Sequence, residues 1–377
     1  MTVGKTYESK ERILNTIYSK PTDRIPISMY ELCPFEGSAY ASFANNEPSY
    51  QPILSYMREN TDTIMQYEAA ISYSYLDKVM EVHSCRENQS TVYNHILHTP
   101  KGDLTAQSIV KDNIFTVWNT EHFLKDSTDI EKYMSLDLTC KVDNTNLRNM
   151  RDKLGENGIV CPSIRDPLCR AAELFSMEDF LIFAITETDK AKKFLDFLWE
   201  MCEVELKGIL AGDVKDMMVR VVGPEYATPP YLPNQYFSDF VTKYLKRIAS
   251  MINDAGAISR VHSHGKVRFA LEEFAKTDVM CVDPVEPLPD GDISLGEIKE
   301  IYGDRFTLLG NIELKELEVA SEEQVERLVK GVVEEGKKGG HFILMPTATP
   351  ITVPLASVVE RNMFKMIECG LKYGSMK

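Results

Sequence analysis

The chain has 377 residues, of which 44% are hydrophobic and 26% are charged, a composition typical of a soluble globular protein. Its formal net charge of −15 argues against a nucleic-acid-binding surface, which would be basic. No stretch approaches the run of about 18 apolar residues that a membrane span needs, and the N-terminus lacks the hydrophobic core of a signal peptide, so we expect a cytoplasmic protein.

The N-terminal third predicts two looser units and an insertion. Residues 11–20 are typical of a helix and residues 24–30 of a strand. Residues 51–60 predict a second helix, which leads to the short apolar stretch 63–71. Residues 79–118 then alternate between polar and apolar side chains over several short runs, so they predict a small antiparallel β insertion after the second unit.

From residue 159 onward, strand and helix patterns alternate. A strand at 159–167 precedes long helical segments that reach about residue 212. Five strand–helix units follow, with strands at 217–223, 257–265, 279–285, 306–312 and 341–347. This alternation predicts a parallel sheet of eight strands in all. An open doubly wound sheet would usually carry a glycine-rich phosphate loop, and none occurs. We therefore predict a single (β/α)8 TIM barrel domain over residues 1–377.

Polar residues at the predicted strand ends are the candidates for a substrate pocket, because barrel active sites form at the C-terminal ends of the strands. Asp283 and Glu286 could be a carboxylate pair for acid–base work, or they could cap the following loop and helix. The residues that we expect in the pocket are Tyr30, Glu31, Glu68, Arg165, Tyr226, Asp283 and Thr347.

The stretch SRVHSHGKV contains two histidines one residue apart, His262 and His264. Side chains alternate along a strand, so both histidines point to the same side. Glu225 follows the neighbouring strand, and two imidazoles with one carboxylate form a three-ligand set that leaves a position open. We predict zinc or another divalent metal at these three residues, which are also the predicted catalytic residues. The alternative is that the histidines only hydrogen-bond to loops.

Several short motifs, in their order along the chain, bring a family into view. They are GPEY after the fourth strand, H-x-H-G at the fifth, GDRFTLLGNI at the seventh and FILMPT at the eighth. This order resembles the uroporphyrinogen decarboxylase superfamily, whose fold is a (β/α)8 barrel. The superfamily also contains zinc-dependent methyltransferases that move a methyl group from a corrinoid protein to coenzyme M or a folate.

The chain departs from both branches of the superfamily, and the first departure places it closer to the methyltransferase-like branch. The decarboxylases carry an arginine-bearing motif after the first strand, whereas residues 28–40 here contain two glutamates and no arginine. The methyltransferases carry His-x-Cys at the fifth strand and a further cysteine after the eighth. Here His262 matches the histidine, His264 replaces the first cysteine, and the second falls near Ala348. The resemblance thus implies a metal site with altered ligands.

The resulting hypothesis is a metal-dependent methyltransferase-like enzyme that moves a methyl group between a corrinoid protein and a small acceptor, a thiol or a folate. The corrinoid partner is implied only by the resemblance, and we expect a monomer or a homodimer. A second hypothesis is a decarboxylase of porphyrin metabolism that works without metal, with Arg165 as its main carboxylate anchor. A third is a non-catalytic accessory protein that binds a corrinoid or a metal.

Overall fold

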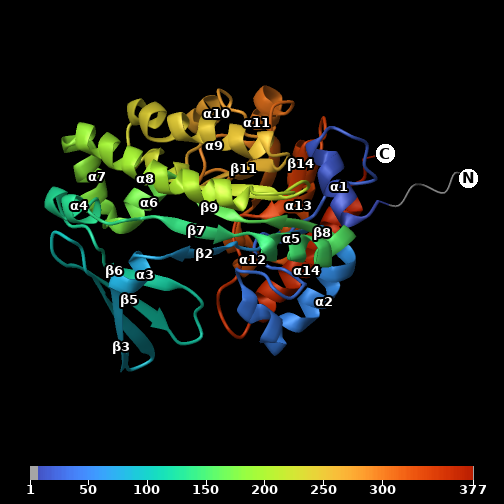
Figure 1. The fold of residues 1–377 in the computed structure, drawn as a ribbon. Helices are drawn as coiled ribbons and strands as arrows, with labels where there is room; N and C mark the ends of the chain where they lie inside the picture. Colours follow the sequence, from blue (N-terminus) through green and yellow to red (C-terminus); the bar gives the residue numbers. More distant parts are fainter. Residues whose placement is uncertain (1–6, 377) are drawn as a thin grey trace, which may run out of the picture.

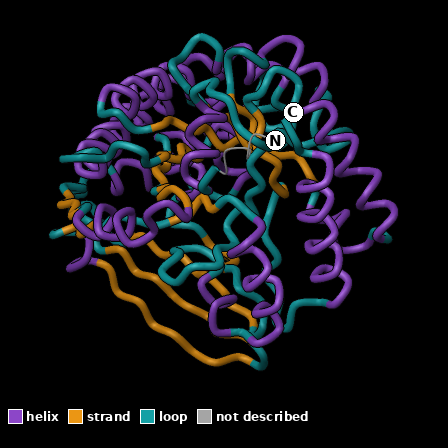
Figure 2. The backbone as a smooth tube through the Cα atoms, turned by 90° about the vertical axis from the view of Figure 1, so that its right-hand side faces the viewer, coloured by secondary structure: helices purple, strands orange, loops and turns teal. Residues whose placement is uncertain are grey.

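The computed structural model describes residues 7–376, which form a ring of parallel strands surrounded by helices (Figures 1 and 2). The hydrogen-bonded order around most of the ring is β14, β13, β12, β11, β10, β9, and β8 pairs with β1. Pro162 separates β8 from β9, which together occupy one position in the ring. The strands are β1 (Thr63–Gln66), β8 (Gly158–Cys161), β9 (Ser163–Arg165), β10 (Met218–Val222), β11 (Ile258–Ser263), β12 (Cys281–Pro284), β13 (Thr307–Ile312) and β14 (Phe342–Pro346).

Residues 24–30 close the ring without forming a long regular strand. Ile27 makes a parallel bridge with Leu344 of β14, and the amide of Ser28 donates to the Leu344 carbonyl at 2.9 Å. On the other side the amide of Asp62 donates to the Ile27 carbonyl at 2.6 Å, immediately before β1. Within residues 7–376 the ring therefore has eight strand positions, which is the predicted (β/α)8 barrel.

Helices cover the outside of the ring, and α13 illustrates why they form where they do. Ser321 and Gln324 make a capping box at its start, and valines four residues apart are buried along one face. The helices are α1 (Ser9–Ile17), α2 (Gln51–Asn60), α3 (Leu76–Val79), α4 (Ser127–Tyr133), α5 (Thr145–Leu154), α6 (Pro167–Leu174), α7 (Met177–Thr186), α8 (Thr188–Ile209), α9 (Lys243–Asp254), α10 (Arg268–Phe274), α11 (Leu295–Tyr302), α12 (Leu314–Val319), α13 (Glu322–Gly336) and α14 (Ser357–Tyr373).

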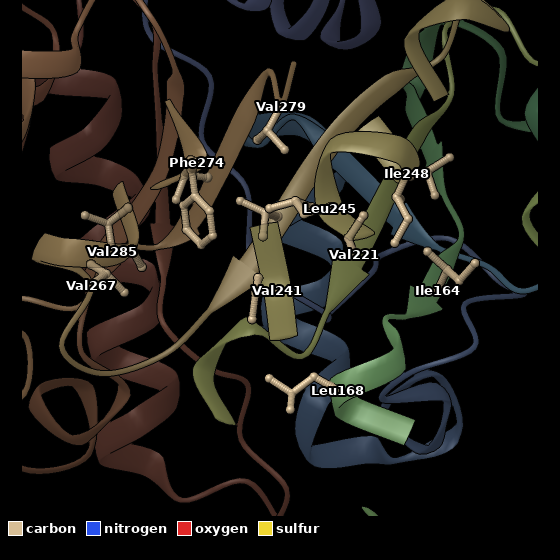
Figure 3. Close-up of a cluster of buried hydrophobic side chains, with 14 of the residues drawn as sticks. Ile164, Leu168, Val221, Val241, Leu245, Ile248, Val267, Phe274, Val279 and Val285 are labelled. Atoms are coloured by element: carbon tan, nitrogen blue, oxygen red, sulfur yellow. The ribbon is translucent and has the colours of Figure 1, made fainter. Parts of the chain in front are cut away.

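The larger core lies between the strands and the helix layer. Figure 3 shows part of it, where Val221 of β10 lies beside Leu245 and Ile248 of α9. All three side chains are fully buried. Burying each of them stabilises the fold by about 1.5–3 kcal/mol relative to an exposed side chain. Because strand side chains alternate, the neighbours of Val221 point the other way, into the barrel.

A second, smaller core fills the inside of the barrel near the N-terminal ends of the strands. It contains Ile64, Met218 and Ile258 from three strands, together with Ile13 and Ile17 from α1. Helix α1 therefore covers this end of the barrel with apolar side chains. Polar chemistry is left to the opposite end, where the strands finish.

The predicted β insertion is present and is somewhat longer than expected. It is a four-stranded antiparallel sheet in the order β3-β4-β5-β6, which projects from the barrel at the lower left of Figure 1. The prediction ended at residue 118, whereas the last strand continues to Glu121. A separate antiparallel pair joins the insertion region to the barrel. The strands are β2 (Ala70–Tyr73), β3 (Met80–Glu87), β4 (Ser90–Leu97), β5 (Leu104–Lys111), β6 (Val117–Glu121) and β7 (Cys140–Asp143).

The helix that follows β10 begins irregularly. Residues 235–256 have the amphipathic pattern of one continuous helix, but a 3-10 turn covers Asn234–Tyr236 and a π-helical turn covers Ser238–Thr242 before α9 begins. Within residues 7–376, no helix combines the length and the apolar character needed to cross a bilayer.

Candidate active site

Strand β11 points two chemically important side chains toward the inside of the barrel. Ile258 belongs to the interior core, and alternation therefore places Arg260 and His262 on the same inward side. His264 follows directly after the strand. In the neighbouring β10, Arg220 pairs in register with Arg260, so two buried arginines lie side by side in the barrel.

His262 is held by a buried carboxylate. Its Nδ1 lies 2.8 Å from Oδ2 of Asp283. The two oxygens of the same carboxylate each accept a hydrogen bond from Arg260, Oδ1 at 2.5 Å and Oδ2 at 2.6 Å. Burial lowers the pKa of His262 to about 4, although Asp283 opposes that effect. The imidazole is therefore neutral at pH 7. With its Nδ1 proton directed at Asp283, its Nε2 lone pair faces the hydroxyl of Tyr30 at 3.3 Å.

Asp283 itself stays ionised. Burial alone would raise the pKa of this carboxyl, but Arg260 and His262 together hold it below its ordinary value. The pair of hydrogen bonds from Arg260 is bidentate, which fixes the carboxylate plane and, through it, the orientation of the His262 ring. Of the two roles considered for Asp283, the structure therefore favours a role in the site over a loop cap.

His264 is held in the same manner by a second carboxylate. Its Nδ1 lies 2.6 Å from Oε1 of Glu286, whose Oε2 accepts from the amide of Gly265 at 2.6 Å. Burial would lower the pKa of His264, but the hydrogen bond and charge of Glu286 outweigh it and raise the pKa. The rings of His262 and His264 are nearly perpendicular, with centroids 4.6 Å apart.

Glu225 and Asp166 form an acidic corner beside the histidines. Oε2 of Glu225 and Oδ2 of Asp166 are both buried without a hydrogen-bond partner in the structure. Burial raises the pKa of Glu225 to about 7. Burial, with the charge of Glu225 adding to it, raises the pKa of Asp166 to about 8. Both carboxyls are therefore able to hold a proton near neutral pH.

Gly223 permits this corner to form. Its φ is +134°, and a Cβ at this position would lie 2.3 Å from Oδ1 of Asp166. A side chain at residue 223 would therefore be strained and would displace Asp166. The same Oδ1 atom accepts from the amide of Cys169 at 2.7 Å and caps α6.

The predicted metal ligands are chemically suitable but are not gathered in this conformation. A carboxylate holds Nδ1 of each histidine, the arrangement usual for metal-bound histidine, so Nε2 is the nitrogen that would bind a metal. Nε2 of His262 would have to exchange the Tyr30 hydroxyl for the metal. The unpartnered Oε2 of Glu225 is a third suitable donor. Within residues 7–376, however, no group of three His, Cys, Asp or Glu side chains is placed so that it could hold a metal ion. Metal binding at these residues would require side-chain movement.

A cavity of about 470 Å³ opens beside His262 at the mouth of the barrel. Five of the predicted site residues line it, which are Tyr30, Glu31, Glu68, Arg165 and His262. The other lining residues are Tyr40, Ala69, Ile71, Tyr73, Ser163, Ile164, Arg170, Glu173, Glu205, Arg220 and Val222. The cavity therefore draws on β2 and two helices as well as on the barrel strands.

The remaining predicted pocket residues do not line this cavity. Asp283 is completely buried behind His262. Tyr226 is half-buried next to Glu225. Thr347 is buried, and its hydroxyl donates to Glu313 at 3.1 Å and accepts from the amide of Leu314 at 3.3 Å. Thr347 thus fastens the segment after β13.

Sequence reasoning missed the two barrel arginines and one ion pair in the cavity wall. Arg260 lies two residues before His262, so the R-x-H-x-H alternation could have revealed it. Arg220 in the run MVRVV carried a similar signal, because a charged residue within a buried strand needs a partner. The pair between Arg170 of α6 and Glu205 of α8 had no comparable signal, because the two residues lie on different helices and are 35 positions apart in the sequence.

Comparisons with known proteins agree with the fold and with the family resemblance. Residues 119–361 match the family model described as uroporphyrinogen decarboxylase. A methyltransferase from Methanosarcina mazei has a similar structure, with a TM-score of 0.60 and 16% sequence identity over 98% of this chain and 99% of that chain. At this identity the likeness shows the fold alone.

A sugar phosphate isomerase/epimerase from Parabacteroides distasonis is much less similar. It has a TM-score of 0.31 and 12% identity over 59% of this chain and 73% of that chain, so it supports no argument about function. Among curated proteins, none matches the sequence.

Proposed function

Because the chain belongs to the uroporphyrinogen decarboxylase family, we propose that it is a methyltransferase-like enzyme that moves a methyl group between a corrinoid protein and a small acceptor, a thiol or a folate. The observation that carries this proposal is the state of His262. It is neutral and buried, and Asp283 holds Nδ1 so that the Nε2 lone pair faces the hydroxyl of Tyr30, which lines the cavity together with His262. A fixed neutral imidazole at a barrel mouth is suited to catalysis rather than to stability.

Zinc or another divalent metal is a further part of the proposal. His262 and His264 would hold it through Nε2, because Asp283 and Glu286 occupy Nδ1 of the two rings. Glu225 would hold it through Oε2, which has no hydrogen-bond partner in the structure. When bound, the metal would act as a Lewis acid that makes the acceptor more nucleophilic. Asp283 and Glu286 would keep the two rings oriented and strengthen the imidazoles as ligands.

The methyl donor would be a corrinoid protein that docks over the mouth of the barrel. The acceptor would release its S–H or N–H proton to solvent and use its lone pair to form the new bond to the methyl carbon, while the donor would keep the electron pair of the broken bond. The cavity wall would exclude water, and the Tyr30 hydroxyl, 3.3 Å from Nε2 of His262, would help to position the acceptor.

Decarboxylation of a porphyrinogen is less well supported by the cavity. Each lining arginine is already paired with a glutamate: Arg220 with Glu31 at 3.0 Å, Arg165 with Glu173 at 2.8 Å, and Arg170 with Glu205. A substrate that carries many carboxylates needs cationic groups that are free to bind it. The arginines of this cavity would first have to give up their present partners.

A methyl-transfer assay tests the proposal directly. Methylcobalamin would serve as the donor, and a small thiol or tetrahydrofolate as the acceptor, with added zinc, while the cobalamin absorbance is followed. We expect turnover by the wild type and a loss of about 100-fold or more in His262→Ala. His83→Ala in β3 is the control, because that side chain is 67% exposed and lies on the insertion sheet. No turnover with either acceptor, or equal rates in wild type and His262→Ala, would reject the proposal.

A further inference from the structure

The charges that line the cavity do not cancel. Three of its four glutamates form ion pairs with its three arginines, as described above. Glu68 is the fourth, and within the described part of the chain it has no basic partner within ion-pair distance. The cavity therefore has one surplus negative charge, and its position is known.

The two carboxylate oxygens of Glu68 differ in their surroundings. Oε2 accepts a hydrogen bond from the amide of Ser163 at 3.1 Å. Oε1 is buried and has no partner in the structure. Burial raises the pKa of Glu68, although Ser163 and the more distant charges of Arg220 and Arg165 oppose the rise. A buried carboxylate oxygen without a donor is costly, so this atom calls for a donor that the chain does not supply.

A second unpartnered atom lies next to the same wall. Gln66, two residues before Glu68, is 1% exposed, and its Nε2 has no hydrogen-bond partner in the structure. Its Oε1 accepts from the hydroxyl of Ser163 at 3.3 Å, and Ser163 lines the cavity. Gln66 itself does not line the cavity, so Glu68 is the residue of this pair that a bound molecule would meet.

The aromatic side chains indicate what kind of cation would fit. The Arg220 guanidinium carbon already lies 5.1 Å from the ring centre of Tyr40 and 6.0 Å from that of Tyr30. These rings are therefore engaged by an internal cation, and a quaternary ammonium would compete with Arg220 for them. An ammonium with N–H groups would instead donate to the carboxylate of Glu68.

We propose that the cavity selects a small substrate with a protonated primary or secondary amine, which pairs with the carboxylate of Glu68. The inference rests on the proposed function, because it assigns this cavity to the substrate. Binding can be measured without turnover, so a failure of the methyl-transfer assay and a failure of amine binding are separate results.

The test is a saturation-transfer NMR titration of the full chain with ethylammonium, tetramethylammonium and propionate at equal ionic strength. We expect ethylammonium to bind more tightly than either of the other two ions. Glu68→Gln should weaken ethylammonium binding by about tenfold or more, because a charge-assisted hydrogen bond is lost. Glu334→Gln is the matched control, since Glu334 lies on the surface of α13 and pairs only with Lys330.

The pH dependence of ethylammonium binding gives a second readout, which can be measured on the wild type alone. Burial raises the pKa of Glu68, so as the pH falls through that raised pKa the carboxyl takes up a proton and ethylammonium binding by the wild type should weaken. In Glu68→Gln this dependence should disappear. Equal binding of all three ions, or equal ethylammonium binding by wild type and Glu68→Gln, would overturn the proposal and would assign the unpartnered oxygen to bound water.

Discussion

Arg260 and Asp283 form an ion pair inside the barrel, and both side chains are at most 1% exposed. Replacing Asp283 with asparagine would leave the Arg260 charge buried without its partner. We expect the free energy of unfolding to fall by about 3–5 kcal/mol, the usual cost of breaking a buried pair. Urea unfolding would measure the change.

The matched control for that substitution is Asp290→Asn. Asp290 also forms an ion pair, with Lys315, but both of these side chains are nearly half exposed. Exposed pairs contribute about 0–1 kcal/mol, so the control should remain close to the wild type. Equal effects of the two substitutions would contradict the view that burial makes the Asp283 pair important.

The metal hypothesis depends on the two histidines and can be tested at that scale. We expect about one divalent ion per chain in protein purified without a histidine tag, and its loss in His264→Ala. Elemental analysis would measure both, with His83→Ala as the control. A wild type that stays free of metal after incubation with zinc, manganese and cobalt would reject metal binding and would leave His262 as a proton acceptor or hydrogen-bonding group.

At the scale of elements, helix α6 connects stability with pH through its capping residue. The pKa of Asp166 is raised from its ordinary 3.8 to about 8, so the folded chain holds a proton over a pH range in which the unfolded chain has lost it. The contribution of Asp166 to the free energy of unfolding is therefore fully present below about pH 4 and is lost as the pH rises toward about 8. Asparagine could still accept from the amide of Cys169.

We accordingly expect Asp166→Asn to flatten the decline of stability between about pH 4 and about pH 8. Unfolding free energies of wild type and variant at several pH values would show it. Glu225 titrates in both proteins, so only the difference between the two curves reports on Asp166. Parallel curves would mean that Asp166 is ionised in the folded protein throughout this range.

Elements with a regular pattern could be predicted from the sequence, and contacts between elements could not. The run MVRVV and the alternation around His262 predicted β10 and β11 because a barrel strand has a fixed period of two. Glu68 was predicted at the pocket because it lies at the C-terminal end of a predicted strand. Arg170 and Glu205 meet only because α6 packs on α8, and no local pattern records that contact. The irregular start of α9 likewise leaves no clear trace in an amphipathic sequence.

The whole barrel closes at a point where the backbone contributes little. Between residues 24–30 and β1, the backbone bond from Asp62 to Ile27 is reinforced by the Asp62 side chain, which accepts from the Ile27 amide at 2.9 Å. The same carboxylate pairs with Arg12 of α1 and with Arg24, each at 2.6 Å. Asp62 is 0% exposed. One buried carboxylate thus joins residues 24–30, the start of β1 and helix α1.

We therefore expect Asp62→Ala to loosen closure of the ring as well as to lower overall stability, by about 3–5 kcal/mol. Hydrogen exchange should show it, with faster exchange at the amides of Ile27 and β1 than at those of β13 and β14, which pair over five residues. Asp213→Asn is the control, because that side chain is 67% exposed where it meets Arg151. If the variant is destabilised but exchange rises equally in all strands, Asp62 supports the fold as a whole and closure does not depend on it.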